Sequence, residues 1–320
     1  MEKYQFRKYN YQYRMFFLKE KRILMKWLNG KCSVEHVGST SIPGLGGKGI
    51  VDVLVGVKSK NLHSFITPLE ATGYEFREKA STPNRLFFRR DYEVAEETRR
   101  VHIHLTEFNG KDWNEMIAFR DYLLKHPEEV KKYAKIKKEA VKRAQGEGEI
   151  YREFKCSFME EITKKQLAIN SLILKVQEIV KCATVLKNKH TDNKNAPVNY
   201  ACIFSHGQEE YDALVKLTRI IGKVVKETST GLLFQIEPLK TISGVLQLLK
   251  IRIPDVTRPE LGDADFTIVN FSNFKKKYLA RRGFKLIPRE NFEMIELIDK
   301  NFNVRAYFSN PPLDKQLNIK

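Results

Sequence analysis

The alternation of apolar and polar residues in the first half of the chain predicts a small mixed sheet covered by helices. Apolar side chains recur at near-helical spacing over residues 13–28, and residues 34–37 and 50–57 form apolar strand patterns around a glycine-rich loop. The other expected elements are a helix over 62–72, strands over 74–78, 84–91 and 101–106, and helices over 112–125, 128–144 and 149–167. Helices grouped on a mixed sheet indicate an α+β fold.

The second half of the chain repeats one order of elements. A strand, a helix and three further strands are expected over 199–253, and the same order recurs over 265–308, beginning with a strand over 265–271. Gly222 and Gly283 each follow the helix of their set, a position that favours glycine. No residue-level identity relates the sets, so the repeat is one of element order. It predicts paired βαβββ units that form a half-barrel.

A polar segment divides the two halves. Residues 187–197 (KNKHTDNKNAP) are rich in Lys and Asn and end in proline, as linkers often do. We therefore expect a first domain over 1–168 and a helical extension and linker over 169–196. A second domain, a candidate ligand-binding module, is expected over 197–320.

Composition and cysteine usage favour a protein of the reducing cytoplasm. The 320 residues are 42% hydrophobic, enough for the cores of two ordinary domains. No apolar run approaches the roughly 20 residues that span a bilayer, and the N-terminal residues lack the pattern of a secretory leader. The four cysteines lie far apart without a CxxC pair, which argues against a disulfide framework or a zinc ribbon. We expect a cytoplasmic location and no membrane partner.

The net charge of +18 favours polyanionic partners such as nucleotides or nucleic acid. A proteome that is generally rich in lysine explains the charge equally well. The lysines scatter over helical segments such as 131–143, without the interleaved aromatic residues that single-strand binding uses.

Residues 36–57 (HVGSTSIPGLGGKGIVDVLVGV) hold the clearest candidate for chemistry. A glycine-rich turn lets backbone amides approach a phosphate closely, and Lys48 adds a positive charge. Asp52 interrupts an apolar strand, where a carboxylate is costly unless a partner such as a metal ion pairs with it. Glycine-rich turns between strands are also common without any ligand. A Walker-type loop is excluded, because no Gly-Lys-Ser/Thr occurs at the required spacing.

His102 and His104 are the next candidates. They lie two residues apart on a strand and share a face, so they can bind a divalent metal or contact phosphate. The alternative is a polar sheet face that pairs with Asp or Glu. Two-metal phosphoryl transfer normally uses a second carboxylate two residues after the first, and that position is Leu54.

Other cations could complete an anion site. Arg85 and Arg89 share a strand face and could clamp a triphosphate, with surface salt bridges as the alternative. Lys155 lies among aromatic residues, where a lysine often has an anionic partner. His36 could reach the same pocket or be a structural histidine. No nucleophile triad is recognisable.

Three segments resemble the GrpB family over about residues 9–167. They are EHVGSTSIPGLGGKGIVDVLVGV, the strand RRVHIHLTE, and the helical AFRDYLLKHPEEVKKYAKIKKE with YREFKCSFMEEI. The resemblance implies a nucleotidyltransferase-like fold of the polymerase beta superfamily, in which Gly38 and Ser39 would meet a nucleoside triphosphate and Asp52 would be the first acid. Leu54 departs from the second acid of that motif. Residues 34–37 are then either a strand or the end of a helix.

The second half resembles the vicinal oxygen chelate fold in element order alone. Its strands lack the His and Glu metal ligands of those enzymes, so a metal-free ligand-binding barrel is expected. Asp263, Asp265, Arg305 and Tyr307 are candidates to line a polar pocket in it.

Together these features predict a nucleotidyltransferase that moves a nucleotide from a metal-bound NTP to an unknown acceptor, a small molecule or RNA. The alternative is a catalytically inactive nucleotide- or nucleic-acid-binding module on the same scaffold, which Leu54 favours. Asp52 is the candidate catalytic residue, and Mg²⁺ or Mn²⁺ the expected metal. The candidate metal ligands are Asp52, His102 and His104. The candidate nucleotide-binding residues are Gly38, Ser39, Thr40, Lys48, Arg89 and Lys155.

Overall fold

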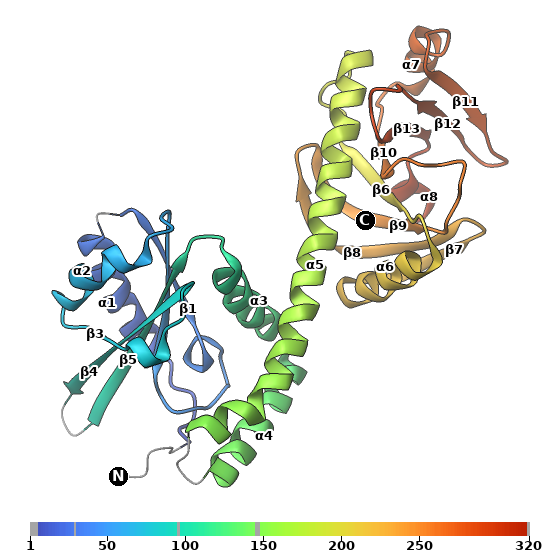
Figure 1. The fold of residues 1–320 in the computed structure, drawn as a ribbon. Helices are drawn as coiled ribbons and strands as arrows, with labels where there is room; N and C mark the ends of the chain where they lie inside the picture. The colour runs from blue at the N-terminus through green and yellow to red at the C-terminus, as the bar shows by residue number, and fades with distance from the viewer. Residues whose placement is uncertain (1–5, 29, 95–96, 145–147, 319–320) are drawn as a thin grey trace. The chain divides into compact units, whose positions relative to one another are not determined.

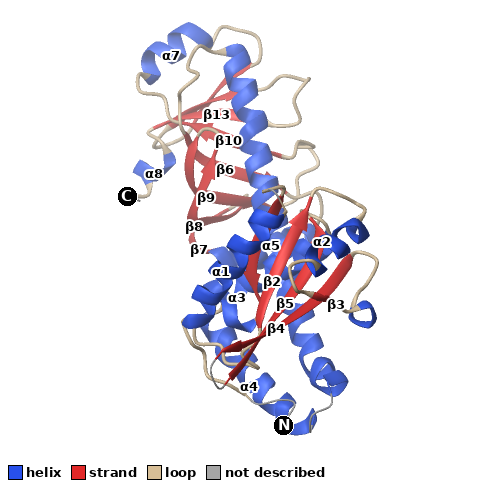
Figure 2. Ribbon diagram, turned by 90° about the vertical axis from the view of Figure 1, so that its left-hand side faces the viewer, coloured by secondary structure: helices blue, strands red, loops and turns tan. Residues whose placement is uncertain are grey.

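The computed structural model describes residues 6–28, 30–94, 97–144 and 148–318 (Figure 1). The chain divides into two compact units, Met1–Leu167 and Ala168–Lys320. Both units combine a sheet with helices (Figure 2), which confirms the predicted α+β class.

The first unit is built on a mixed five-stranded sheet with the strand order β1-β2-β5-β4-β3. Its strands are β1 (Cys32–Val37), β2 (Val51–Val57), β3 (Glu75–Phe76), β4 (Arg85–Val94) and β5 (Glu97–Glu107). β2 and β5 run parallel, and the other neighbours are antiparallel. The parallel pair brings the strand of Asp52 beside the histidine strand.

Helices cover both faces of this sheet because side chains alternate along each strand. Val51, Val53 and Val55 of β2 pack with Leu24 of α1 (Gln12–Trp27) on one face. On the other face, Leu54 packs with Trp113. Trp113 belongs to α3 (Lys111–Lys125), which is followed by α4 (Pro127–Ala144).

One prediction in this unit is corrected, and one alternative that the sequence left open is decided. The helix expected over 62–72 is a 3₁₀ turn, Leu62–Phe65, followed by the short α2 (Ile66–Glu70). Pro68 has no N–H to donate to residue 64, so one continuous helix is interrupted there. Residues 34–37 belong to a strand rather than the end of a helix. The break expected over 145–148 falls largely outside the described residues.

The second unit holds an eight-stranded sheet with the order β11-β12-β13-β10-β6-β9-β8-β7. The first set of elements is β6 (Val198–Phe204), α6 (Gln208–Ile221), β7 (Gly222–Thr228), β8 (Gly231–Thr241) and β9 (Gly244–Arg252). The second is β10 (Gly262–Phe266), α7 (Phe271–Tyr278), β11 (Phe284–Pro288), β12 (Glu293–Leu297) and β13 (Arg305–Asn310), followed by α8 (Leu313–Gln316). In each set the first strand pairs parallel with the last, and β6 joins β10 antiparallel. The predicted repeat of element order is confirmed.

The strand expected over 265–271 ends earlier, at Phe266. The side chain of Asn270 accepts a hydrogen bond from the N–H of Asn273 and caps α7. The polar cap competes with strand pairing and so begins the helix.

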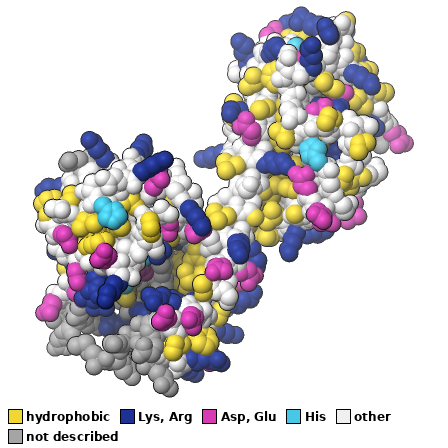
Figure 3. All heavy atoms as spheres, in the orientation of Figure 1, with side chains coloured by type: hydrophobic (Ala, Val, Ile, Leu, Met, Phe, Trp, Pro, Cys, Tyr) yellow, Lys and Arg dark blue, Asp and Glu magenta, His cyan; other side chains and the backbone are white. Residues whose placement is uncertain are grey.

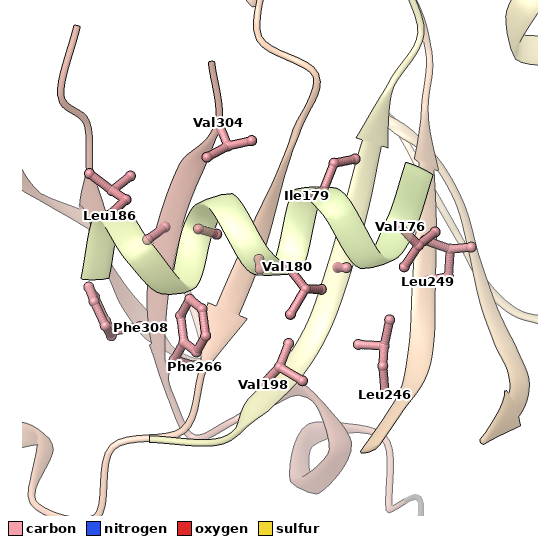
Figure 4. Packing of buried hydrophobic residues seen from close by; sticks show 14 of the residues in the cluster. Val176, Ile179, Val180, Leu186, Val198, Leu246, Leu249, Phe266, Val304 and Phe308 are labelled. Carbon is pink, nitrogen blue, oxygen red and sulfur yellow. The ribbon is translucent and has the colours of Figure 1, made fainter. Parts of the chain in front are cut away.

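The segment expected as an extension and linker, 169–196, belongs mainly to one long helix, α5 (Gly148–His190). Val176, Ile179, Val180 and Leu186 of α5 point toward the sheet of the second unit and pack there (Figure 4). Their helical spacing is the reason: one face of α5 is continuously apolar up to Leu186. The polar segment after Leu186 begins with a buried lysine. This residue, Lys187, donates hydrogen bonds to the carbonyls of residues 193 and 194.

No helix within the described ranges, the 43-residue α5 included, has the apolar stretch that a bilayer-spanning helix requires.

Candidate functional site

The glycine-rich turn passes directly over the carboxylate of Asp52. β1 ends at Val37, opposite Asp52, and Gly38 then adopts φ 70° before a 3₁₀ turn over Ser39–Ser41. A Cβ at Gly38 would lie 2.2 Å from Oδ2 of Asp52. Glycine is therefore required here both for the positive φ and for the close approach.

Asp52 lies against both histidines of β5. Nδ1 of His102 is 3.3 Å from Oδ1 of Asp52, and Nε2 of His104 is 3.5 Å from the same oxygen. The ring of Phe87 packs on both imidazoles, with centroid distances of 4.7 and 5.3 Å. The structure thus brings together the three side chains that the sequence singled out as metal ligands.

The local charges follow from burial and hydrogen bonding. Burial alone would raise the pKa of Asp52, but the hydrogen bonds from His102 and His104 outweigh it and hold that pKa below its usual range. Burial lowers the pKa of His104, and the charge of Asp52 only partly opposes this. Asp52 is therefore ionised and His104 neutral near pH 7.

Leu54 occupies the position where a second carboxylate would be expected. It is fully buried and packs with Val37 and Trp113. The contact with α3 requires an apolar side chain here. Asp52 therefore has no second carboxylate beside it on β2.

Three lysines surround the turn. Nζ of Lys137 donates to the carbonyl of Gly46 at 2.5 Å, and Nζ of Lys48 and of Lys155 lie 4.1 and 4.3 Å from the ring centre of Tyr151. A Cβ at Gly47 would lie 2.5 Å from both Nζ of Lys137 and Oγ of Ser39. The missing side chain leaves room for the amine and the hydroxyl to lie close to the turn.

These amines are hard to keep charged without an anion. Burial, together with the charge of Lys155, lowers the pKa of Lys48 and of Lys137 to about 7, and burial also lowers the pKa of Lys155. In each case Asp52 is the charge that favours the protonated amine. A polyanion held among the lysines would favour their protonated forms.

The remaining predicted residues have structural partners. Oγ1 of Thr40 donates to the carbonyl of Ile50 and lies 3.0 Å from Nε2 of His36, so it braces the turn. The ring of His36 stacks on Phe17 with a centroid distance of 4.6 Å, and burial lowers its pKa to about 4. Of the two alternatives for His36, a pocket residue or a structural histidine, these contacts correspond to the structural one.

The arginines of β4 form ion pairs. Arg89 lies 3.5 Å from Glu75 and 3.7 Å from Asp91, and Arg85 lies 3.8 Å from Asp112. These contacts correspond to the salt-bridge alternative for both residues.

Lys137 and Tyr151 were not singled out from the sequence. Lys137 lies on the buried stripe of α4 with Tyr133, Ala140 and Ala144. The sequence signal that could have identified Lys137 is its position among the core residues of a helical repeat. Nothing in the sequence pattern placed α4 against the glycine turn.

Metal binding stays a prediction. Within the described ranges, no three His, Cys, Asp or Glu side chains are arranged to hold a metal ion by themselves. Asp52 directs Oδ1 at the imidazoles and Oδ2 at Gly38. One carboxylate oxygen fits Mg²⁺ when phosphate oxygens of a bound nucleotide supply further ligands.

Figure 3 shows how charged side chains are distributed over one face of the molecule. In the view of Figure 3, Lys and Arg side chains are interspersed with Asp and Glu on both units.

Curated relatives match part of the chain. The glutamate-rich protein GrpB of Alkalihalophilus pseudofirmus is 31% identical over 153 residues, covering 47% of this chain and 88% of that protein. UPF0157 protein YqkA of Bacillus subtilis is 32% identical over 108 residues, 33% of this chain and 30% of that protein. The coverage of other relatives is intermediate, for example 55% of a Pseudomonas aeruginosa UPF0157 protein.

Two solved structures are similar to part of the chain. A conserved protein GrpB from Enterococcus faecalis is 27% identical, with a TM-score of 0.45, covering 51% of this chain and 97% of that one. The Cid1 poly(U) polymerase bound to MgGTP is 16% identical, with a TM-score of 0.28, covering 41% of this chain and 45% of that one. TM-scores of this size by themselves establish neither a shared fold nor an activity.

The sequence model of the GrpB protein family matches residues 3–165, slightly more than half of the chain. The matched range includes the glycine turn, the histidine strand and α4, in agreement with the motifs and the geometry of the first unit. The chain therefore belongs to the GrpB protein family.

Proposed function

We propose that the first unit binds a nucleoside triphosphate at the glycine turn and transfers its nucleotidyl group to an acceptor. The observation that carries the proposal is the meeting of Asp52 with three lysines, two of them with a pKa of about 7, around a turn that has no side chain in the way. Three amines gather here around the one carboxylate of Asp52, and a bound triphosphate would favour their protonated forms.

The division of roles follows from position. Lys48, Lys137 and Lys155 would hold phosphate oxygens as point charges, and backbone amides of the turn would add donors. Oδ2 of Asp52 would hold Mg²⁺ together with the phosphates, and the ion would neutralise the charge of the leaving group.

In the transfer step, an acceptor oxygen forms a bond to the α-phosphorus and the α–β bridging P–O bond breaks, releasing pyrophosphate. The acceptor proton passes to His102. Because Nδ1 of His102 faces Asp52, that contact keeps the proton on Nδ1 and leaves Nε2 to accept another. Positioning and electrostatics then supply most of the rate enhancement.

A second candidate function is nucleotide binding without transfer. The observation that favours it is Leu54, buried against Trp113 where a two-metal site would have its second acid. Binding and transfer are separable by experiment.

Binding is tested by calorimetry with a non-hydrolysable NTP and Mg²⁺. Loss of one charge-assisted contact in Lys137→Met should weaken binding about 10- to 100-fold. Lys135→Met is the matched control, since Lys135 is exposed on the same helix. Equal affinities of the two variants would contradict the lysine site.

Transfer is tested by pyrophosphate release from labelled NTPs with pools of RNA or small metabolites as acceptors. Asp52→Asn should abolish release while leaving the unit folded. Wild-type protein that binds NTP yet releases no pyrophosphate with any pool would establish the non-catalytic alternative.

A further inference from the structure

A pocket lies at the other end of the sheet face that carries Asp52. It has a volume of about 350 Å³ and forms where β5 ends and α3 begins. Thr106 of this pocket follows His102 by four residues, so it lies about 13 Å from the Asp52 end at about 3.3 Å per strand residue. Its polar lining residues are Lys60, Asn84, Thr106, Glu107, Lys111 and Asp112.

One residue that lines this pocket carries a buried hydroxyl. Thr106 is 1% exposed, and its Oγ1 has no hydrogen-bond partner among the described residues. Arg85 lies opposite Thr106 in the β4–β5 pairing, and its Nε is likewise buried without a partner in the described part of the chain. Buried donors of this kind are rare, because each costs about 1–3 kcal/mol unless an acceptor is supplied.

The start of α3 adds further donors. Gly110 precedes the helix and provides no side-chain cap. Helix geometry leaves the N–H groups of Lys111, Asp112 and Trp113 without acceptors inside the 15-residue helix. This end of a helix carries partial positive charge and favours anions.

Two carboxylates, Glu107 and Asp112, also line the pocket. Glu107 is exposed at the rim, where solvent screens its charge. Oδ1 of Asp112 lies 3.8 Å from Nη1 of Arg85. The amines of Lys60 and Lys111, both exposed, balance them in charge at the mouth.

We propose that this pocket binds a phosphate group, with Thr106 and the first turn of α3 as its donors. Phosphate binding here does not depend on nucleotide transfer. If the proposed function also holds, the distance from Asp52 suits an acceptor that carries a phosphate at one end and the reacting hydroxyl at the other; this assignment rests on the proposed function.

Trp113 offers a direct reporter, because it lies in the first turn of α3 and is 6% exposed. The chain has two tryptophans, so Trp27→Phe leaves Trp113 alone. In that background, titration with inorganic phosphate should change the Trp113 fluorescence saturably, and sodium chloride at equal ionic strength should not.

Variants separate this pocket from the lysine site. Thr106→Val should weaken the Trp113 response about fivefold or more, and its thermal midpoint should stay equal or rise, because the lost hydroxyl has no hydrogen-bond partner among the residues that the structure describes. Lys60→Met should also weaken the response, and Glu107→Gln should strengthen it. Lys155→Met should leave it unchanged.

Two results would overturn the proposal. One is a phosphate response that Thr106→Val and Lys60→Met leave at wild-type affinity, or no saturable response at all. The other is loss of the response in Lys155→Met, which would assign the signal to phosphate bound at the glycine turn. Failure of NTP transfer, by contrast, would not contradict the proposal that this pocket binds phosphate.

Discussion

The two units treat buried aspartates in opposite ways. Asp52 of the first unit lies against two imidazoles, and these contacts hold its pKa low despite burial. Asp263 and Asp265 of the second unit lie on β10, where burial raises the pKa of each to about 7. Asp265 accepts hydrogen bonds from the N–H and hydroxyl of Ser309, whereas Oδ1 of Asp263 has no partner among the described residues. The comparison teaches that the partner, and not burial alone, decides whether a carboxylate keeps its charge.

Buried lysines show the same contrast. Lys187 of the second unit donates to Asn188 and to the carbonyls of residues 193 and 194, which tie down the end of α5. Lys137 of the first unit donates to Gly46 and faces the charges of Lys48 and Lys155. Lys187 is satisfied by its own chain, whereas Lys137 makes no ion pair within the described ranges, and the charge of Asp52 only partly offsets its burial.

The largest expected effect comes from a side chain at Gly38. Gly38→Ala should abolish nucleotide binding and lower the free energy of unfolding of the first unit by about 3 kcal/mol or more, combining backbone strain with overlap on Asp52. Gly44→Ala is the control, since Gly44 has φ 78° with open space around it. Gly44→Ala should lower the free energy of unfolding only by the backbone strain at positive φ, about 1–2 kcal/mol. Urea unfolding followed by tryptophan fluorescence reports on the first unit, which contains both tryptophans. Equal losses in the two variants would refute the close approach.

The lysine comparison gives the next largest effect. Lys187→Met should destabilise the second unit by about 2–4 kcal/mol, because buried carbonyls lose their donor. Lys137→Met should change the stability of the free first unit by less than about 1 kcal/mol, since an apolar side chain replaces a strained charge. Hydrogen exchange measured on peptides from each unit distinguishes the two. A stability loss in Lys137→Met as large as that in Lys187→Met would make Lys137 structural.

Nucleotide binding should take up protons. With a pKa of about 7, Lys48 and Lys137 are partly neutral in the free protein, and a bound triphosphate restores their charge. Affinity should therefore fall by about tenfold or more as pH rises from 6.5 to 8.5, an estimate that follows from linkage. Calorimetry in buffers of different ionisation enthalpy measures the uptake directly. Binding without proton uptake would show that both amines are already charged.

The stability of the second unit should fall as pH rises from about 4 to 7. Over this range Asp263 and Asp265, with folded pKa values of about 7, stay protonated in the folded state but ionise in the unfolded state, where the pKa is 3.8. The folded state then binds more protons, so increasing pH favours unfolding. Circular dichroism melts at several pH values test this, and Asp263→Asn should flatten the dependence. Stability that rises over this range would contradict the assignment.

The smallest effect is expected at Arg89. Its ion pairs with Glu75 and Asp91 are partly exposed, so Arg89→Gln should cost less than about 1 kcal/mol of stability. Nucleotide affinity should fall less than threefold, because the guanidinium is engaged by carboxylates. A tenfold fall would instead support the triphosphate clamp that the strand spacing indicates.

Much of the local structure follows from residue pattern. The strand with Asp52, the two-residue spacing of His102 and His104, and the repeated element order of the second unit are all confirmed, because each depends on alternation or helical periodicity within a short segment. The helix over 62–72 was wrong because Pro68 interrupts it, a local cue that periodicity alone underweights. The polar segment over 187–197 begins inside α5, which ends at His190, because Lys187 is buried and donates to the carbonyls of residues 193 and 194.

The sequence by itself determined the elements, the glycine turn, the isolated acid at Asp52 and the membership of the first unit in its family. Only the tertiary structure decided that β2 and β5 run side by side, that Lys137 reaches Gly46 across 91 residues of sequence, and that Leu54 and Thr106 lie beneath the start of α3. The physical reason is that element formation depends on neighbours within a few residues, whereas a site depends on which distant groups the packed core holds within a few ångströms.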